Sequence, residues 1–112
     1  MHEQFTAILV ANDAFVVRAL APLLEDAGFR VIVAPEPERA LSLLQTARSD
    51  IVLMDASIPA PGATDELKRL RGLTSGDVPV IVFDGAGRRA RRGLEDPFDP
   101  IGITETALDA VA

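Results

Sequence analysis

The stretch VLMDASIPAPG, residues 52–62, places one carboxylate at the end of an apolar run and then turns. Residues 51–54 are apolar at every position, which is typical of a strand covered on both faces in a parallel sheet. Pro59, Pro61 and Gly62 favour a turn directly after that strand. Asp55 is therefore expected at the end of a buried strand, either as an ordinary turn residue or as a group held at the sheet edge for chemistry.

Apolar runs and helical patterns alternate on both sides of this stretch. The expected strands are residues 6–10, 30–34, 51–54 and 78–83, and the expected helices are about 14–27, 38–47, 64–73 and, more weakly, 104–111. This βαβαβαβ order predicts a parallel sheet with helices on both faces, joined by right-handed crossovers. In such sheets, ligands and chemistry collect at the carboxyl ends of the strands.

Composition narrows the function classes. A chain of 112 residues with 48% hydrophobic residues fits one α/β domain with a buried core. The chain has no cysteine and one histidine, His2, which excludes thiol chemistry and cysteine-ligated zinc and argues against a histidine-based triad. The net charge of -6 argues against direct nucleic-acid binding. With no run of membrane-spanning length and no signal-peptide pattern, the sequence predicts a cytoplasmic domain.

Polar side chains follow three of the expected strands. Asn12 and Asp13 follow the first, Asp55 the third and Asp84 the fourth. Parallel strands end at the same edge, so three carboxylates are expected to meet there. Such a cluster could bind a divalent cation such as Mg²⁺. Asp13 is equally a good helix N-cap and Asp84 a good turn residue, so structural roles stay open beside the functional one.

Taken together, these segments resemble the receiver domain of two-component response regulators. The segments that carry the resemblance are AILVAND (7–13), EDAGFRV (25–31), VLMDASIP (52–59), VPVIVF (78–83) and DPFDP (96–100). The resemblance implies a flavodoxin-like doubly wound sheet with strand order 2-1-3-4-5. It also implies a single receiver-like domain over residues 1–112 with a signalling role and no enzyme activity of its own.

The resemblance assigns roles at the sheet edge where these strands end, here called the acidic edge (Asn12, Asp13, Asp55 and Asp84). Asp55 matches the phospho-acceptor aspartate, which receives a phosphoryl group from a histidine. Asp13 matches a direct Mg²⁺ ligand, and the backbone carbonyl of Ser57 matches a third ligand beside these two. Asn12 stands where the family has the other acid of its pair, so one carboxylate is lost and Mg²⁺ binding is expected to be weak at best.

Two positions that normally contact the phosphate carry the wrong charge. Asp84 matches the switch Thr or Ser, and Asp96 matches the family's lysine. Two unit charges ~4 Å apart interact by roughly 4 kcal/mol at an effective dielectric of about 20. A phosphoryl group on Asp55 would meet repulsion at both positions, so the resemblance points to a degenerate receiver, or pseudo-receiver.

The distal part of the chain also departs from the family pattern. Asp84 and Asp96 are only 12 positions apart (96 − 84 = 12), fewer than the family usually has. Helix four is expected to be shortened or missing, strand five to be at most a stub near residues 93–95, and residues 85–100 to be irregular. Four basic residues fall in this segment, Arg88, Arg89, Arg91 and Arg92. They form either a solvated loop or a contact surface for an acidic partner protein.

Three functions compete at this point. The first is a phosphorylation-independent protein-interaction module in signal transduction, binding a histidine kinase or an output protein. The second is a working Mg²⁺-dependent receiver phosphorylated on Asp55 by a histidine kinase. The third is a small phosphatase or a nucleotide-binding domain, which the chain does not favour because Ser57 replaces the second acid of Asp-x-Asp and no Gly-rich loop follows the first strand. Apolar surface left by the shortened distal part could favour a homodimer.

Overall fold

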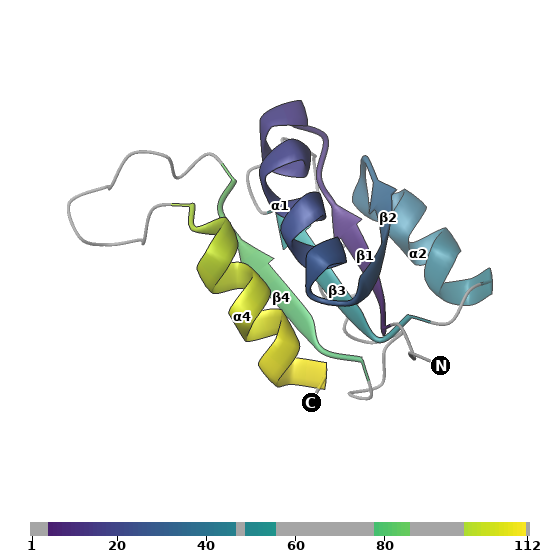
Figure 1. Cartoon of the computed structure of the whole chain (residues 1–112). Coiled ribbons are helices and arrows are strands. Elements are labelled where there is room, and N and C mark those ends of the chain that lie inside the picture. Colours follow the sequence, from purple (N-terminus) through teal and green to yellow (C-terminus); the bar gives the residue numbers. More distant parts are fainter. Residues whose placement is uncertain (1–4, 47–48, 56–77, 86–97, 112) are drawn as a thin grey trace.

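Four parallel strands form the centre of the structure, in the order β2-β1-β3-β4 (Figure 1). The structure is a computed structural model that describes residues 5–46, 49–55, 78–85 and 98–111. The strands are β1 (Phe5–Val10), β2 (Phe29–Ala34), β3 (Ile51–Asp55) and β4 (Val80–Phe83), and the helices are α1 (Ala14–Asp26), α2 (Pro37–Thr46) and α4 (Pro100–Val111). The predicted α/β class and the predicted order of the first four strands are confirmed.

Two boundaries differ by two residues or more from those expected, and each of these differences involves a proline. β4 begins at Val80, after Pro79, which has no N–H for a strand ladder. The last helix begins at Pro100, earlier than the expected residue 104, because proline is pre-organised for the first helical position. The helix expected at 64–73 and the strand stub expected at 93–95 lie outside the described residues.

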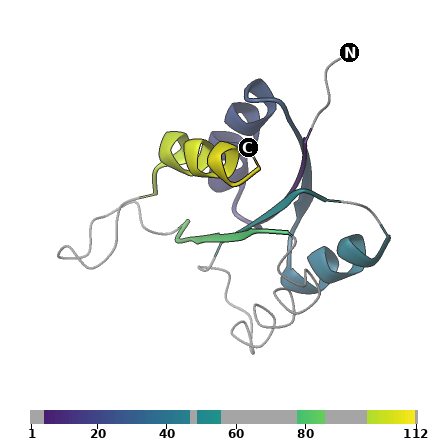
Figure 2. The same cartoon turned by 90° about the horizontal axis from the view of Figure 1, so that it is seen from below.

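Helices cover the sheet on both faces, as Figure 2 shows: α1 and α4 lie on one side and α2 lies on the other. Alternate residues of the central strands divide between two cores. Leu9 and Leu53 pack with α1 and α4, whereas Ile8 and Val52 pack with α2. All four side chains are fully buried, which explains why β1 and β3 read as continuous apolar runs.

Local sequence sets the ends of α1. The Asp13 side chain accepts a hydrogen bond from the Phe15 N–H at 2.8 Å and so caps the first turn. The helix continues through Pro22 as far as Asp26. Gly28 then adopts a φ of 104°, a left-handed conformation that glycine takes at little cost, and the chain turns directly into β2.

Truncation of a central core residue should destabilise the fold strongly. Leu53→Ala removes a fully buried side chain from β3 and is expected to lower the free energy of unfolding by about 2–5 kcal/mol in urea denaturation. Ile101→Ala, at a side chain that is 63% exposed, is the control and should change it by less than about 0.5 kcal/mol. Equal losses in the two variants would contradict the assignment of the core.

Candidate functional site

Asp55 is the last residue of β3 and lies beside Phe83 of β4 in the parallel register. Its side chain is only 1% exposed, which is unusual for a carboxylate. Its Oδ1 accepts a buried hydrogen bond of 2.8 Å from the backbone N–H of Gly85. The contact ties the end of β3 to the chain leaving β4, because Gly85 lies two residues after the end of that strand.

Gly85 fits against Asp55 only because it lacks a side chain. A Cβ at this position would overlap the Asp55 carboxyl group and would lie 2.8 Å from Cγ2 of Val16 on α1. Gly85, Asp55 and Val16 therefore meet at one closely packed point. The sequence interpretation did not assign Gly85 a role, although a glycine directly after a strand and its terminal acid was the available signal.

The other polar residues of this edge lie at the ends of β1 and β4. Asp13 caps α1, so the structural role that the sequence left open is present in the structure. Asn12 is exposed, and Asp84 is partly buried directly after β4. The carboxyl ends of β1, β3 and β4 do lie along one edge of the sheet, since Val10 pairs with Met54 and Asp55 with Phe83.

The donor set does not form a metal centre in the part of the chain that the structure describes. No group of three Asp, Glu, His or Cys side chains there is arranged to hold a metal ion. One carboxylate oxygen of Asp55 accepts a hydrogen bond from the Gly85 N–H, and one of Asp13 accepts the hydrogen bond that caps α1. The Mg²⁺ site that the resemblance implies also needs the backbone carbonyl of Ser57, which lies outside the described residues, so that site stays a prediction.

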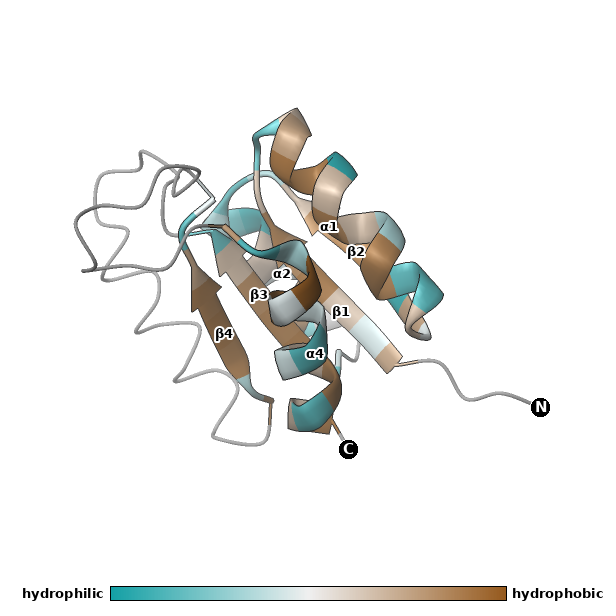
Figure 3. Ribbon diagram, turned by 60° about the vertical axis from the view of Figure 1, so that its left-hand side comes forward, coloured by the Kyte–Doolittle hydropathy of each residue, from teal (hydrophilic) through white to brown (hydrophobic). Residues whose placement is uncertain are grey.

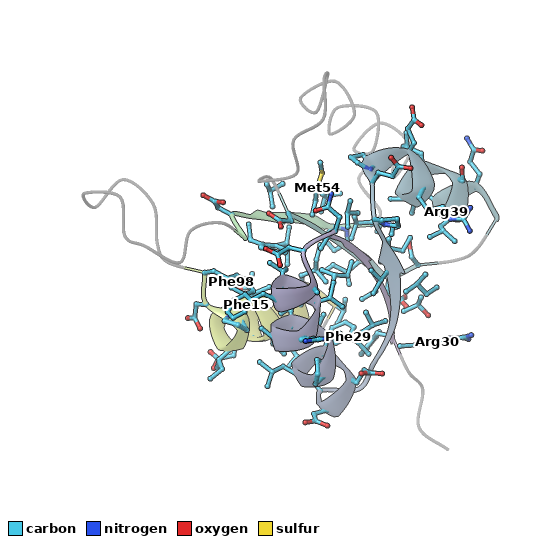
Figure 4. The ribbon with its side chains drawn as sticks, turned by 90° about the horizontal axis from the view of Figure 1, so that it is seen from above. Phe15, Phe29, Arg30, Arg39, Met54 and Phe98 are labelled. Carbon is cyan, nitrogen blue, oxygen red and sulfur yellow. The ribbon has the colours of Figure 1, made fainter. Side chains whose placement is uncertain are left out.

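Three phenylalanines pack together beside the acidic edge. The rings of Phe83 and Phe98 stack with centroids 5.7 Å apart, and Phe15 meets Phe98 edge-on at 6.3 Å (Figure 4). Aromatic pairs of this geometry contribute roughly 0.5–1.5 kcal/mol beyond their buried area. The cluster joins α1, β4 and the residues leading into α4, and it was not predicted from the sequence.

Several predicted site residues lie outside the described residues: Ser57, Asp96, Arg88, Arg89, Arg91 and Arg92. Their assigned roles stay predictions. Of the helices that the structure describes, none has the length and apolar character needed to cross a membrane.

The fold and this edge define a class: a doubly wound α/β domain with aspartates where its parallel strands end. Residues 7–94 match the response regulator receiver domain family. The chain therefore belongs to the receiver domain family, a family of non-enzymatic modules of two-component signal transduction. Receiver domains typically bind Mg²⁺.

Curated relatives agree with this assignment. The chain is 39% identical over 90 residues to the transcriptional regulatory protein CpxR of Escherichia coli, which covers 79% of this chain and 38% of CpxR. It is 35% identical over 77 residues to the sensory transduction protein RegX3 of Mycobacterium tuberculosis, covering 69% of this chain and 33% of RegX3. The chain thus spans well under half the length of these relatives.

Solved structures share the fold. The chemotaxis response regulator CheY4 of Vibrio cholerae superposes with a TM-score of 0.76 at 20% identity, covering 96% of this chain and 99% of that one. The receiver domain of the hybrid histidine kinase CckA gives a TM-score of 0.73 at 24% identity, with 96% and 99% coverage. At these identities the likeness establishes the fold.

The contact at Gly85 predicts a cost for any side chain there. Gly85→Ala is expected to lower the free energy of unfolding by about 1–3 kcal/mol, because the new methyl group must displace Asp55 or Val16. The loss should be smaller in a Val16→Ala background, where part of the obstruction is gone. Fully additive losses in the double variant, measured in urea, would contradict this contact.

The Asp55 side chain should matter as a hydrogen-bond acceptor. Asp55→Ala leaves the buried Gly85 N–H without this partner and is expected to cost about 1–3 kcal/mol of stability. Asp55→Asn retains an oxygen in the same place and should cost less. Thermal or urea unfolding of both variants checks this order, and a costlier Asn variant would argue against the role of the acceptor.

Proposed function

We propose that this receiver domain acts as a phosphorylation-independent protein-interaction module in signal transduction. The observation that supports the proposal most strongly is the state of Asp55, a buried side chain whose Oδ1 is held by the Gly85 N–H at 2.8 Å. Its proposed partners are signalling proteins, a histidine kinase or an output protein, and its proposed location is the cytoplasm.

Packing around Asp55 supports the proposal. A phosphoryl group adds three strong acceptor oxygens and up to two negative charges. At Gly85 there is no space even for a methyl group between Asp55 and Val16. A phosphoryl group on the side of Asp55 that faces Gly85 would require the β4 exit (Asp84 and Gly85) to move away. The hydrogen bond from Gly85 to Asp55 would then be lost.

Charge supports it further. Asp84 follows β4 directly, at the position that matches the hydroxyl residue of the family, and a carboxylate has no proton to donate at neutral pH. If Asp96 matches the lysine, an anion also replaces a cation there and adds to the repulsion. Each such pair is of order 4 kcal/mol at ~4 Å and an effective dielectric of about 20, and each 1.4 kcal/mol is about tenfold in equilibrium.

The second candidate is a working phospho-acceptor that uses Asp55 and Mg²⁺. The observation in its favour is that Asp55 lies at the carboxyl end of β3, in the position that the family uses for the acceptor. In this case Asp13 would bind the ion as well as cap α1 through its Oδ1, or would give up that cap. Arg88, Arg89, Arg91 and Arg92 serve in either case as the proposed contact surface for an acidic partner.

Phosphorylation with a small donor separates the two candidates. Incubation of the protein with acetyl phosphate and Mg²⁺ should leave its intact mass unchanged, because repulsion and packing oppose the phosphoryl adduct. An authentic receiver treated in parallel is the positive control for the donor. A phosphoryl adduct that appears on this chain and is lost in Asp55→Asn would overturn the proposal in favour of the second candidate.

A further inference from the structure

The two residues directly after β4, Asp84 and Gly85, form the only Asp–Gly step in the sequence. β4 is apolar along its length (Figure 3), and Asp84 is the first charged residue after it. An aspartate followed by glycine is chemically labile, because glycine has no Cβ to hinder attack of its backbone nitrogen on the preceding carboxyl group. Each of the other aspartates, and Asn12, is followed by a residue with a Cβ, so the sequence concentrates this chemistry at one peptide bond.

Packing explains why a glycine stands at this labile step. Gly85 is buried, and a Cβ at this position would overlap the Asp55 carboxyl group and lie 2.8 Å from Cγ2 of Val16. Asp55 and Val16 are themselves almost fully buried, so neither can move aside without disturbing the core. The close packing at the end of β3 therefore requires glycine, and the labile step comes with it.

The nitrogen that would attack the Asp84 carboxyl group is held by Asp55. The Gly85 N–H donates a buried hydrogen bond of 2.8 Å to Asp55 Oδ1. Gly85 lies two residues after Phe83, which pairs with Asp55 in the register of β3 and β4. The sheet thus places the acceptor beside the one backbone nitrogen that follows Asp84.

We propose that the Asp84–Gly85 bond is a site of spontaneous isomerisation to isoaspartate, and that the hydrogen bond from Gly85 to Asp55 suppresses this reaction in the folded chain. Asp55 therefore has a protective role at the β4 exit. The inference does not rest on the proposed function, because neither the reaction nor its suppression involves a phosphoryl group or a partner protein.

The reaction needs water and no other reactant. The Gly85 nitrogen bonds to Cγ of the protonated Asp84 carboxyl group, the N–H proton and the carboxyl OH leave together as water, and a succinimide ring forms. A second water molecule opens the ring. Cleavage between the nitrogen and Cγ restores aspartate, whereas cleavage between the nitrogen and the main-chain carbonyl carbon of Asp84 gives isoaspartate, in which the chain runs through Cγ.

The native contacts disfavour both the ring and the product. A succinimide nitrogen carries no proton, so ring closure takes the Gly85 donor away from Asp55 Oδ1. Hydrogen bonds to charged groups are among the costlier ones to lose when they are buried. Isoaspartate also adds one main-chain atom where Asp55 and Val16 leave no room for a methyl group. Isomerisation is therefore expected only from molecules in which the β4 exit has opened.

Incubation in water enriched in heavy oxygen measures the reaction, because each ring opening inserts one labelled oxygen at Asp84. Mass spectrometry of the peptide that contains Asp84 detects the label, and methylation by a protein isoaspartyl methyltransferase identifies the isoaspartate. The folded chain should become labelled at least about tenfold more slowly than the chain unfolded in urea, a factor equivalent to ~1.4 kcal/mol. Equal rates in the folded and unfolded chain would overturn the inference.

Variants of β3 separate the hydrogen bond from general stability. Asp55→Ala removes the acceptor and should speed labelling of the folded protein by about tenfold or more. Leu53→Ala is the matched control, because it destabilises the same strand and leaves the acceptor in place, and it should label like the original chain without denaturant. Asp55→Asn retains an oxygen and should label more slowly than Asp55→Ala. An Asp55→Ala variant that labels no faster than Leu53→Ala would contradict the protective role.

Amide hydrogen exchange of the original chain gives a readout that does not depend on a variant folding. At urea concentrations below the unfolding transition, exchange of the Gly85 amide reports how often its bond to Asp55 opens. The rate of labelling at Asp84 should rise in proportion to that opening. Labelling that stays constant while the Gly85 amide opens more often would show that the hydrogen bond does not control the reaction, and would overturn the inference.

Discussion

The parallel pairing of β1 with β3 is the constraint on which the rest of the structure depends. Both strands are buried on both faces, so their side chains supply the two cores that hold α1 and α4 on one side and α2 on the other. The register from Ala7–Ile51 to Val10–Met54 also sets where the strands end. The polar residues of the acidic edge lie at or just after the strand ends, so the register determines how close they are to one another.

Burial changes which groups can supply hydrogen bonds to the Asp55 carboxylate. An exposed aspartate at a strand end is solvated by water, whereas a side chain that is 1% exposed depends on protein donors. The Gly85 N–H is one such donor, and it comes from the segment that directly follows β4. The same contact stabilises the β4 exit and closes the space that an incoming group would need. The carboxylate of Asp55 therefore has a structural role, as the acceptor that fixes Gly85 beside β3.

The cluster of Phe15, Phe83 and Phe98 links the end of β4 to α1 and to the start of α4. Phe98 contacts both Phe83 on β4 and Phe15 in the first turn of α1. Phe15 is 50% exposed, so the cluster reaches from the core to the surface beside the acidic edge. Phe83, the last residue of β4, is thereby stacked on the residue that leads into α4. The three rings therefore tie the end of β4 to α1 and to the start of α4.

The sequence by itself determined the parallel α/β class and the position of Asp55 at the end of β3, whereas the order of the strands came from the resemblance to receiver domains. The class and the position of Asp55 follow from local apolar periodicity and from the order of the segments along the chain. Tertiary structure alone decided that Gly85 bonds Asp55, that Val16 closes the same point, and that three phenylalanines meet. These residues are up to 83 positions apart (98 − 15 = 83), and only the packing of strands and helices brings their atoms together.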